Sequence, residues 1–202
     1  MKRIVIFASG SGSNAENIID YFWRRPAMSI QFEIFTNNKN AGVIERARRL
    51  HIPCALFSKE QFNNKSFLKA IANADLIILA GFLWLIPEYL VKQYQDKIVN
   101  IHPALLPSYG GKGMYGSKVH EAVIENKEVQ SGITIHYVNE KYDEGKILLQ
   151  ARCEVTSFDD PDSLAEKIHK LEYAYFPIVI DFMQDRSQVC LGSFLRESTT
   201  SV

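Results

Sequence analysis

The chain has 202 residues, of which 47% are hydrophobic and 23% are charged. This length suits one large domain, and the composition is close to the average for soluble globular proteins. Lysine plus arginine and aspartate plus glutamate both number 23, so the formal net charge is zero. Such a chain has no excess of positive charge with which to bind a polyanion, and we expect no nucleic acid among its main partners.

The cysteines and the apolar stretches indicate the cellular compartment of the protein. Cys54, Cys153 and Cys190 lie far apart and form no CxxC pair, which argues against a disulfide framework and a structural zinc site. The longest apolar stretch, residues 76–86, is too short to cross a bilayer. The N-terminal apolar run leads into a Ser-Gly repeat with no cleavage site, so no signal peptide is expected. These features predict a cytoplasmic protein with no membrane partner.

The first half of the chain alternates between strand and helix patterns. Residues 4–8 form a continuous apolar, β-branched run, typical of a strand that is buried on both faces of a parallel sheet. The patterns that follow predict a helix over 14–24, a strand over 30–35, a helix over 43–50, a short strand over 53–57, a helix over 62–72 and a buried strand over 76–80. Repeated βα units of this kind predict an α/β fold, a doubly wound, mostly parallel sheet with helices on both faces.

The second half is less regular. Its patterns predict a strand over 98–102, a helix over 117–126, and strands over 131–138 and 147–155 that pair as an antiparallel hairpin around 139–145. Ser163 and Glu166 have the spacing of a capping box, so the last helix is expected to begin at Ser163 and to reach about Met183. We expect one domain over residues 1–185 and a solvated tail over 186–202.

A glycine loop over residues 9–14 lies between the first strand and the first helix. Backbone N–H groups at such a helix N-terminus bind anions well. Gly10, Gly12 and Ala15 also satisfy G-x-G-x-x-G/A, but the second strand ends at Asn38 without the acidic residue that a dinucleotide ribose requires. A phosphate site is therefore favoured over an NAD site, and a merely tight turn is the remaining alternative.

Residues 100–103 read Asn-Ile-His-Pro at the carboxyl end of a predicted strand. Asn100 and His102 are two apart, so they project from the same face. An amide that stabilises an oxyanion beside an imidazole that moves a proton suits acyl transfer. The alternative is a capping asparagine and a surface histidine, and Asp143 by itself is an ordinary turn residue.

A second glycine-dense loop covers residues 110–116 and contains Lys112. It does not match the phosphate-loop pattern G-x-x-x-x-G-K-[ST]. Such glycine density indicates a mobile segment or a close approach to a ligand, and a flexible connection is the alternative.

Taken together, these motifs indicate a protein family, which none of them does alone. Residues 9–14, 79–82, 100–107 and 136–138, followed by Asp143, resemble in order and spacing the formyltransferases that use 10-formyltetrahydrofolate. The resemblance covers residues 1–185 and is strongest to the branch that acts on glycinamide ribonucleotide. It implies an enzyme of purine synthesis that transfers the formyl group from 10-formyltetrahydrofolate, as co-substrate, to the amine of 5-phosphoribosylglycinamide. It implies no metal.

The resemblance also implies roles for individual residues. The catalytic residues are Asn100, His102 and Asp143. The residues that contact the ribonucleotide are Gly12, Ser13, Asn14, His169 and Glu172. The residues around the folate are Lys65, Leu83, Trp84, Leu85, Ile86, Val138, Asn139 and Glu140. Trp84 and His169 depart from the arginine and glutamine that are frequent at these positions in the family.

Rival functions remain at this stage. Within the same superfamily, a methionyl-tRNA formyltransferase carries an additional C-terminal domain, and a formyltetrahydrofolate hydrolase carries an N-terminal regulatory domain. This chain is expected to have room for neither. A non-catalytic sugar-phosphate or nucleotide module would use the glycine loop without bringing Asn100, His102 and Asp143 together.

We expect the protein to be a monomer or a homodimer. We also expect Asp143 to raise the pKa of His102.

Overall fold

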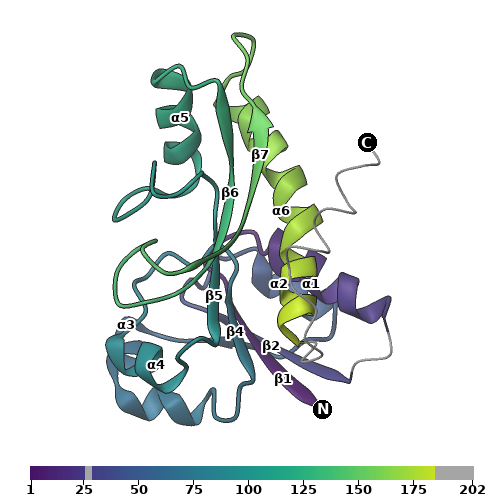
Figure 1. The fold of residues 1–202 in the computed structure, drawn as a ribbon. Coiled ribbons are helices and arrows are strands. Elements are labelled where there is room, and N and C mark those ends of the chain that lie inside the picture. The colour runs from purple at the N-terminus through teal and green to yellow at the C-terminus, as the bar shows by residue number, and fades with distance from the viewer. Residues whose placement is uncertain (26–28, 185–202) are drawn as a thin grey trace.

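A computed structural model of the protein describes residues 1–25 and 29–184. It contains one seven-stranded sheet with the strand order β3-β2-β1-β4-β5-β6-β7 (Figure 1). The strands are β1 (Lys2–Phe7), β2 (Ile30–Thr36), β3 (Cys54–Leu56), β4 (Leu76–Leu79), β5 (Ile98–His102), β6 (Gln130–Tyr137) and β7 (Ile147–Glu154). The first five are parallel, whereas β6 and β7 are antiparallel to their neighbours. The predicted doubly wound sheet with an antiparallel element is confirmed.

Helices cover both faces of this sheet. One face packs against α1 (Ser13–Trp23), α2 (Val43–Arg49) and α6 (Pro161–Gln184). The other face packs against α3 (Lys59–Asn63), the 3-10 helix η1 (Lys65–Lys69) and α4 (Glu88–Gln93). The remaining helix, α5 (Ser117–Glu125), packs against α6. Two apolar cores therefore lie on opposite sides of one sheet.

The central strand β1 contributes to both cores. Ile4 and Ile6 belong to the core under α1 and α6, whereas Val5 and Phe7 belong to the core under α3 and α4. Successive side chains of a strand point to opposite faces, so a strand between two helical layers must be apolar at every position. This explains why the sequence of β1 is continuously apolar rather than alternating.

The predicted helix over 62–72 is wrong. The segment instead forms α3 and η1, which Asn64 separates with an extended backbone and a side chain that accepts a hydrogen bond from the N–H of Ser66. Asparagine competes with the helix through such local hydrogen bonds. The short helix α4 was not predicted at all.

The predicted start of the last helix is also wrong. The helix α6 begins at Pro161, and Asp160 caps it, because the N–H of Ser163 donates to Oδ1 of Asp160 at 2.8 Å. The N–H of Asp160 donates in turn to Oγ of Ser163 at 3.1 Å. The reciprocal cap thus pairs Ser163 with Asp160 rather than with Glu166.

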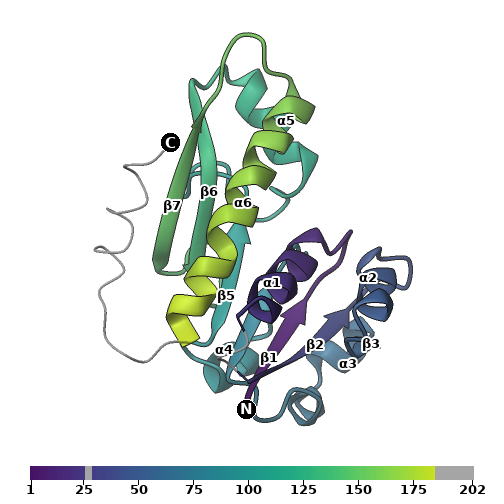
Figure 2. The ribbon, with the colours of Figure 1, turned by 90° about the vertical axis from the view of Figure 1, so that its right-hand side faces the viewer.

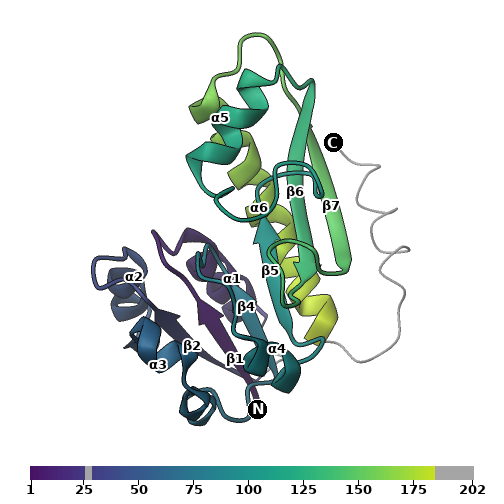
Figure 3. The same cartoon turned by 90° about the vertical axis from the view of Figure 1, so that its left-hand side faces the viewer.

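The hairpin of β6 and β7 continues beyond the parallel strands together with α5 and the first half of α6 (Figures 2 and 3). No helix within residues 1–25 and 29–184 is long and apolar enough to cross a membrane. The predicted tail over 186–202 lies outside the described residues.

Candidate active site

A cavity of about 640 Å³ opens at the carboxyl ends of β1, β4 and β5. This is the position at which open, doubly wound sheets bind ligands. The cavity is lined by both glycine loops, by the segment after β4, by the turn between β6 and β7 and by the middle of α6. Its walls therefore include every motif that the sequence singled out.

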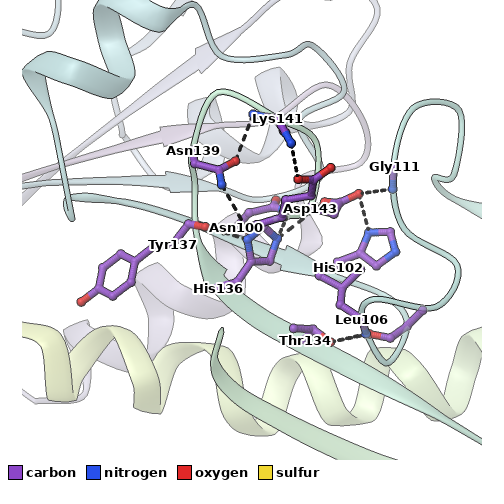
Figure 4. A network of polar contacts seen from close by, with 12 residues as sticks. Asn100, His102, Leu106, Gly111, Thr134, His136, Tyr137, Asn139, Lys141 and Asp143 are labelled. Carbon is purple, nitrogen blue, oxygen red and sulfur yellow. Dashed lines mark hydrogen bonds and ion pairs between the residues drawn. The ribbon is translucent and has the colours of Figure 1, made fainter. Parts of the chain in front are cut away.

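Asn100, His102 and Asp143 all line this cavity, and their side chains lie close together (Figure 4). Nδ2 of Asn100 donates to Oδ1 of Asp143 at 3.4 Å. Nδ1 of His102 lies 3.6 Å from Oδ2 of the same carboxylate. Nδ2 of Asn100 also lies 3.1 Å from Nε2 of His136, which stands opposite Asn100 on β6. The two side chains from β5 and the turn aspartate thus form one polar cluster.

Two carbonyl groups determine the tautomers of the histidines in this cluster. Nδ1 of His136 lies 2.8 Å from the carbonyl of Tyr137, and Nε2 of His102 lies 2.7 Å from that of Tyr109. A carbonyl oxygen only accepts, so each of these nitrogens carries a hydrogen. His136 is thereby left to accept from Asn100, and Nδ1 of His102 is the nitrogen that remains for proton exchange.

The backbone around Asp143 and the segment after His102 are both fixed. The N–H of Gly111 donates to Oδ2 of Asp143 at 2.9 Å, and Asp143 has a left-handed φ of 57°. Thr134 of β6 holds the segment after His102, because its Oγ donates to the carbonyl of Ala104 at 2.7 Å and accepts from the N–H of Leu106 at 3.0 Å. Asp143 and the carbonyl of Tyr109 are therefore held in place before a ligand arrives.

Burial changes the expected protonation of this cluster. Burial lowers the pKa of His102 below its usual value and outweighs the attraction of Asp143, so the prediction of a raised pKa is wrong. Burial also acts to raise the pKa of Asp143, but His136, His102 and the N–H of Gly111 together outweigh it and lower this pKa. At neutral pH the cluster therefore holds a neutral imidazole beside an ionised carboxylate.

The five residues that were predicted to contact the ribonucleotide all line the cavity. Gly12 is the N-cap of α1, and no side chain caps this helix. Ser13 and Asn14 begin the first turn, and Nδ2 of Asn14 donates to the buried carboxylate of Glu172 at 2.9 Å. His169 also approaches this carboxylate, with Nδ1 at 2.9 Å, and this contact raises the pKa of the histidine. The open N–H groups of α1 suit an anion.

The requirement for glycine at position 12 has a structural cause. Gly12 has a φ of 78°, and a Cβ placed there would lie 2.4 Å from Cγ2 of Val43 on α2. The packing of α2 against the loop therefore excludes a side chain whether or not a phosphate is bound. Arg46 supports the same loop, because its Nε donates to the carbonyl of Ser11 at 2.8 Å.

The predicted folate residues divide into two groups. The five that line the cavity are Leu83, Trp84, Leu85, Ile86 and Val138. Trp84 packs edge-on against Phe57, with 5.9 Å between ring centroids, so much of its indole belongs to the neighbouring aromatic core.

Lys65, Asn139 and Glu140 are not among the residues that line the cavity. Lys65 begins η1, and Nδ2 of Asn139 donates to the carbonyl of Glu144 at 3.1 Å within the turn. Lys141 and Tyr142 line the cavity instead. In the described parts of the chain, no group of three or more histidine, cysteine or acidic residues could hold a metal ion.

Comparison with known proteins agrees with this geometry. A sequence model of the family described as formyl transferase matches residues 2–180. The chain belongs to this formyl transferase family. The relation that the sequence motifs predicted is thus confirmed over most of the chain.

Several formyl transferase relatives carry the same name. The chain is 38% identical over 194 residues to a chloroplastic phosphoribosylglycinamide formyltransferase of Arabidopsis thaliana, which covers 92% of this chain and 66% of the relative. A second chloroplastic relative, from Vigna unguiculata, is 36% identical, and the chain spans 60% of its length. The phosphoribosylglycinamide formyltransferase of Bacillus subtilis is 36% identical over 187 residues, 89% of this chain and 93% of that protein. The chain thus spans less than two thirds of the plant relatives but nearly all of the bacterial one.

Solved structures of the same kind share the fold. The phosphoribosylglycinamide formyltransferase of Bacillus halodurans superposes with a TM-score of 0.82 at 30% identity, over 93% of this chain and 97% of that chain. Glycinamide ribonucleotide transformylase 1 of Geobacillus kaustophilus gives a TM-score of 0.81 at 33% identity, over 91% and 98%.

Proposed function

We propose that this formyl transferase moves the formyl group of 10-formyltetrahydrofolate to the amine of 5-phosphoribosylglycinamide. The observation that carries the proposal is the meeting of Asn100, His102 and Asp143 in one cavity, whose wall also contains the N-terminus of α1 and a group of apolar side chains. The names of the bacterial and plant relatives support the same reaction.

Two groups of residues in the cavity wall suit two different substrates. The uncapped N-terminus of α1 provides N–H donors for the phosphate, and Glu172 provides a buried acceptor for the hydroxyl groups of a ribose. The pterin ring of the folate needs an apolar wall, and Leu83, Leu85 and Val138 provide it. Asn100 and His102 lie where the two substrates would meet.

The residues of the cluster divide the chemistry of the transfer between them. When the amine attacks the formyl carbon, negative charge develops on the formyl oxygen. The amide of Asn100 donates to this oxygen with the N–H that makes the longer contact, 3.4 Å to Asp143, in the free protein. One such donor contributes about 3–4 kcal/mol to a transition state. Asp143 is ionised and accepts the amine proton through a water molecule. His102 starts neutral, receives this proton at Nδ1 and delivers it to the departing N10, which is worth roughly 10²–10⁴-fold in rate.

Formyltetrahydrofolate hydrolysis and ligand binding without catalysis are the two competing functions. A protein that only binds ligands is disfavoured. Binding alone does not require Asn100 and His102 to lie beside the same carboxylate, that of Asp143. The hydrolase would use the same three side chains but would have no use for the anion site at α1 or for the buried Glu172. These two features favour transfer to a phosphorylated amine.

A formyl-transfer assay with and without 5-phosphoribosylglycinamide separates the three functions. We expect tetrahydrofolate release to depend on the amine and to equal the amount of formylated ribonucleotide. Equal release with and without the amine would identify a hydrolase. Binding of both compounds without any release would identify a binding module.

Further properties remain proposals that rest on the sequence. We propose a monomer or homodimer that acts in the cytoplasm on small molecules, without nucleic acid and without a metal, and that residues 1–185 form its one domain. The zero formal charge supports the exclusion of nucleic acid. Gel filtration and metal analysis of the purified protein test the oligomeric state and the metal content.

A further inference from the structure

His120 is a buried histidine that the proposed mechanism does not use. It lies on α5, is 6% exposed and lines the same cavity as the catalytic cluster. Its Nδ1 is buried and has no hydrogen-bond partner in the described part of the protein. More than nine in ten buried polar groups in proteins have a partner, so an exception needs a physical explanation.

The charged and titratable groups around His120 place it between the catalytic cluster and the residues predicted to contact the ribonucleotide. The groups that act on it electrostatically are His169, Glu172, Glu121 and His102. Burial is the largest influence and lowers the pKa of His120 below its usual value, so the imidazole is neutral near pH 7. A neutral imidazole offers one donor and one acceptor. This pair complements a hydroxyl or an amide, whereas a phosphate needs donors alone.

A second unpartnered atom occurs on the same cavity. Oδ1 of Asn14 is buried and has no partner among the described residues, although Nδ2 of the same side chain donates to Glu172. Asn14 and His120 come from different helices, α1 and α5, and both line the cavity. Nδ1 of His120 is shielded from solvent in the free protein, but its ring lines the cavity, so a rotation of the ring would turn this nitrogen toward a bound ligand.

We propose that His120 contacts the ribonucleotide directly and binds one of its uncharged hydroxyl or amide groups. This inference rests on the proposed function and adds a specificity residue that none of the sequence motifs indicated. A histidine left without a partner in the free protein is satisfied when the ribonucleotide enters. His120 therefore favours the ribonucleotide over amines that lack such a group.

Three variants separate this role from a structural one. His120→Leu keeps most of the buried volume and removes both polar nitrogens, whereas His120→Asn keeps a donor and an acceptor near Nδ1. His51→Gln, at an exposed position outside the cavity, is the matched control. For each variant we measure binding of 5-phosphoribosylglycinamide by calorimetry, the KM of each substrate and the Tm.

We expect His120→Leu to weaken ribonucleotide binding and raise its KM by about tenfold, with the KM of the folate substrate changed less than twofold. Its Tm should be no lower than that of the wild type, because the substitution removes an unpartnered polar group from the interior. His120→Asn should regain part of the binding, and His51→Gln should behave as the wild type.

Other results would overturn the inference. Unchanged ribonucleotide binding in His120→Leu would show that the imidazole makes no contact, and equal losses for both substrates with a lower Tm would show a structural role. A wild-type protein that binds no 5-phosphoribosylglycinamide would overturn the proposed function together with this inference. The binding of the wild type therefore distinguishes the two failures.

Discussion

Asn100 owes its position to two acceptors rather than to the strand alone. Nε2 of His136 and Oδ1 of Asp143 both face its amide nitrogen, at 3.1 Å and 3.4 Å. The amide is thus oriented before substrate binds, and only the longer of its two contacts has to be exchanged for the developing charge.

Replacement of Asn100 tests this role. We expect Asn100→Ala to lower kcat by about 10²–10³, with both substrate dissociation constants within a few-fold of wild type, because the donor acts only when charge develops. Steady-state kinetics and calorimetry measure the two effects, with the exposed Asn40→Ala as control. A large loss of folate binding with little change in kcat would make Asn100 a recognition residue instead.

Asp143 controls the protonation of His102. Burial lowers the pKa of His102, and the neighbouring carboxylate partly opposes this. His102 must be neutral to receive the proton, so its protonation produces the acidic limb of the activity profile. Asp143→Asn removes the opposing charge and lowers the pKa of His102 further, so this acidic limb moves to lower pH. A pH profile of kcat measures the shift. An unmoved profile would show that the carboxylate does not act on this histidine.

The residues of the site differ in how far the sequence predicts them. Asn100 and His102 are two apart on a strand, and that spacing alone places them on one face. The role of His136 was missed, because its contact with Asn100 depends on the register of β5 with β6. That register is a tertiary property. The folate contact of Lys65 stays a prediction, since Lys65 begins η1 and is not among the residues that line the cavity.

At the scale of elements, α1 shows how a helix end becomes a binding site. Its N-cap is a glycine in the left-handed region, and no side chain occupies the first-turn N–H groups. A serine or aspartate cap would stabilise the helix but would take one of these donors. The glycine therefore leaves the donors free for a ligand.

Two neighbouring glycines provide a matched test of this loop. At Gly12 a Cβ would meet Val43 at 2.4 Å with φ at 78°, whereas at Gly10 a Cβ meets nothing within 4 Å. We expect Gly12→Ala to lower the free energy of unfolding by about 1–3 kcal/mol and to raise the KM of the ribonucleotide more than that of the folate. Gly10→Ala should change stability little. Urea unfolding and kinetics measure both, and equal behaviour of the two variants would contradict this account of the loop.

The predictability of each element follows from its surroundings. The strand β1 is buried on both faces, and its unbroken apolar run identifies it directly. The start of α6 was misjudged, because Asp160, Pro161 and Ser163 provide a stronger signal than Ser163 with Glu166. A proline suits the first position of a helix, and an aspartate before it caps the helix.

At the scale of the whole molecule, buried histidines make stability depend on pH. Burial lowers the pKa of both His102 and His120, so the unfolded chain binds protons that the folded protein does not. The free energy of unfolding therefore falls as pH drops below about 6.5. His169 acts in the opposite sense, because its pKa is raised by Glu172, but its side chain is 53% exposed and the effect is screened.

The resulting prediction concerns the interval from pH 7 to pH 5. We expect the free energy of unfolding to decrease over this interval and His120→Leu to reduce the decrease, since one of the two histidines whose pKa is lowered by burial is then absent. Urea unfolding at several pH values measures both slopes. The same slope in the wild type and in His120→Leu would show that His120 does not take part in this dependence.

The most direct test of the catalytic cluster is a double-mutant cycle on the single-turnover rate of formyl transfer. His102→Ala, Asp143→Asn and the double variant are compared with the wild type at saturating substrates. If the two side chains pass one proton as a unit, the double variant is little slower than the slower single variant. Losses that multiply in full in the double variant would show that His102 and Asp143 act independently, and the proposed proton path would be wrong.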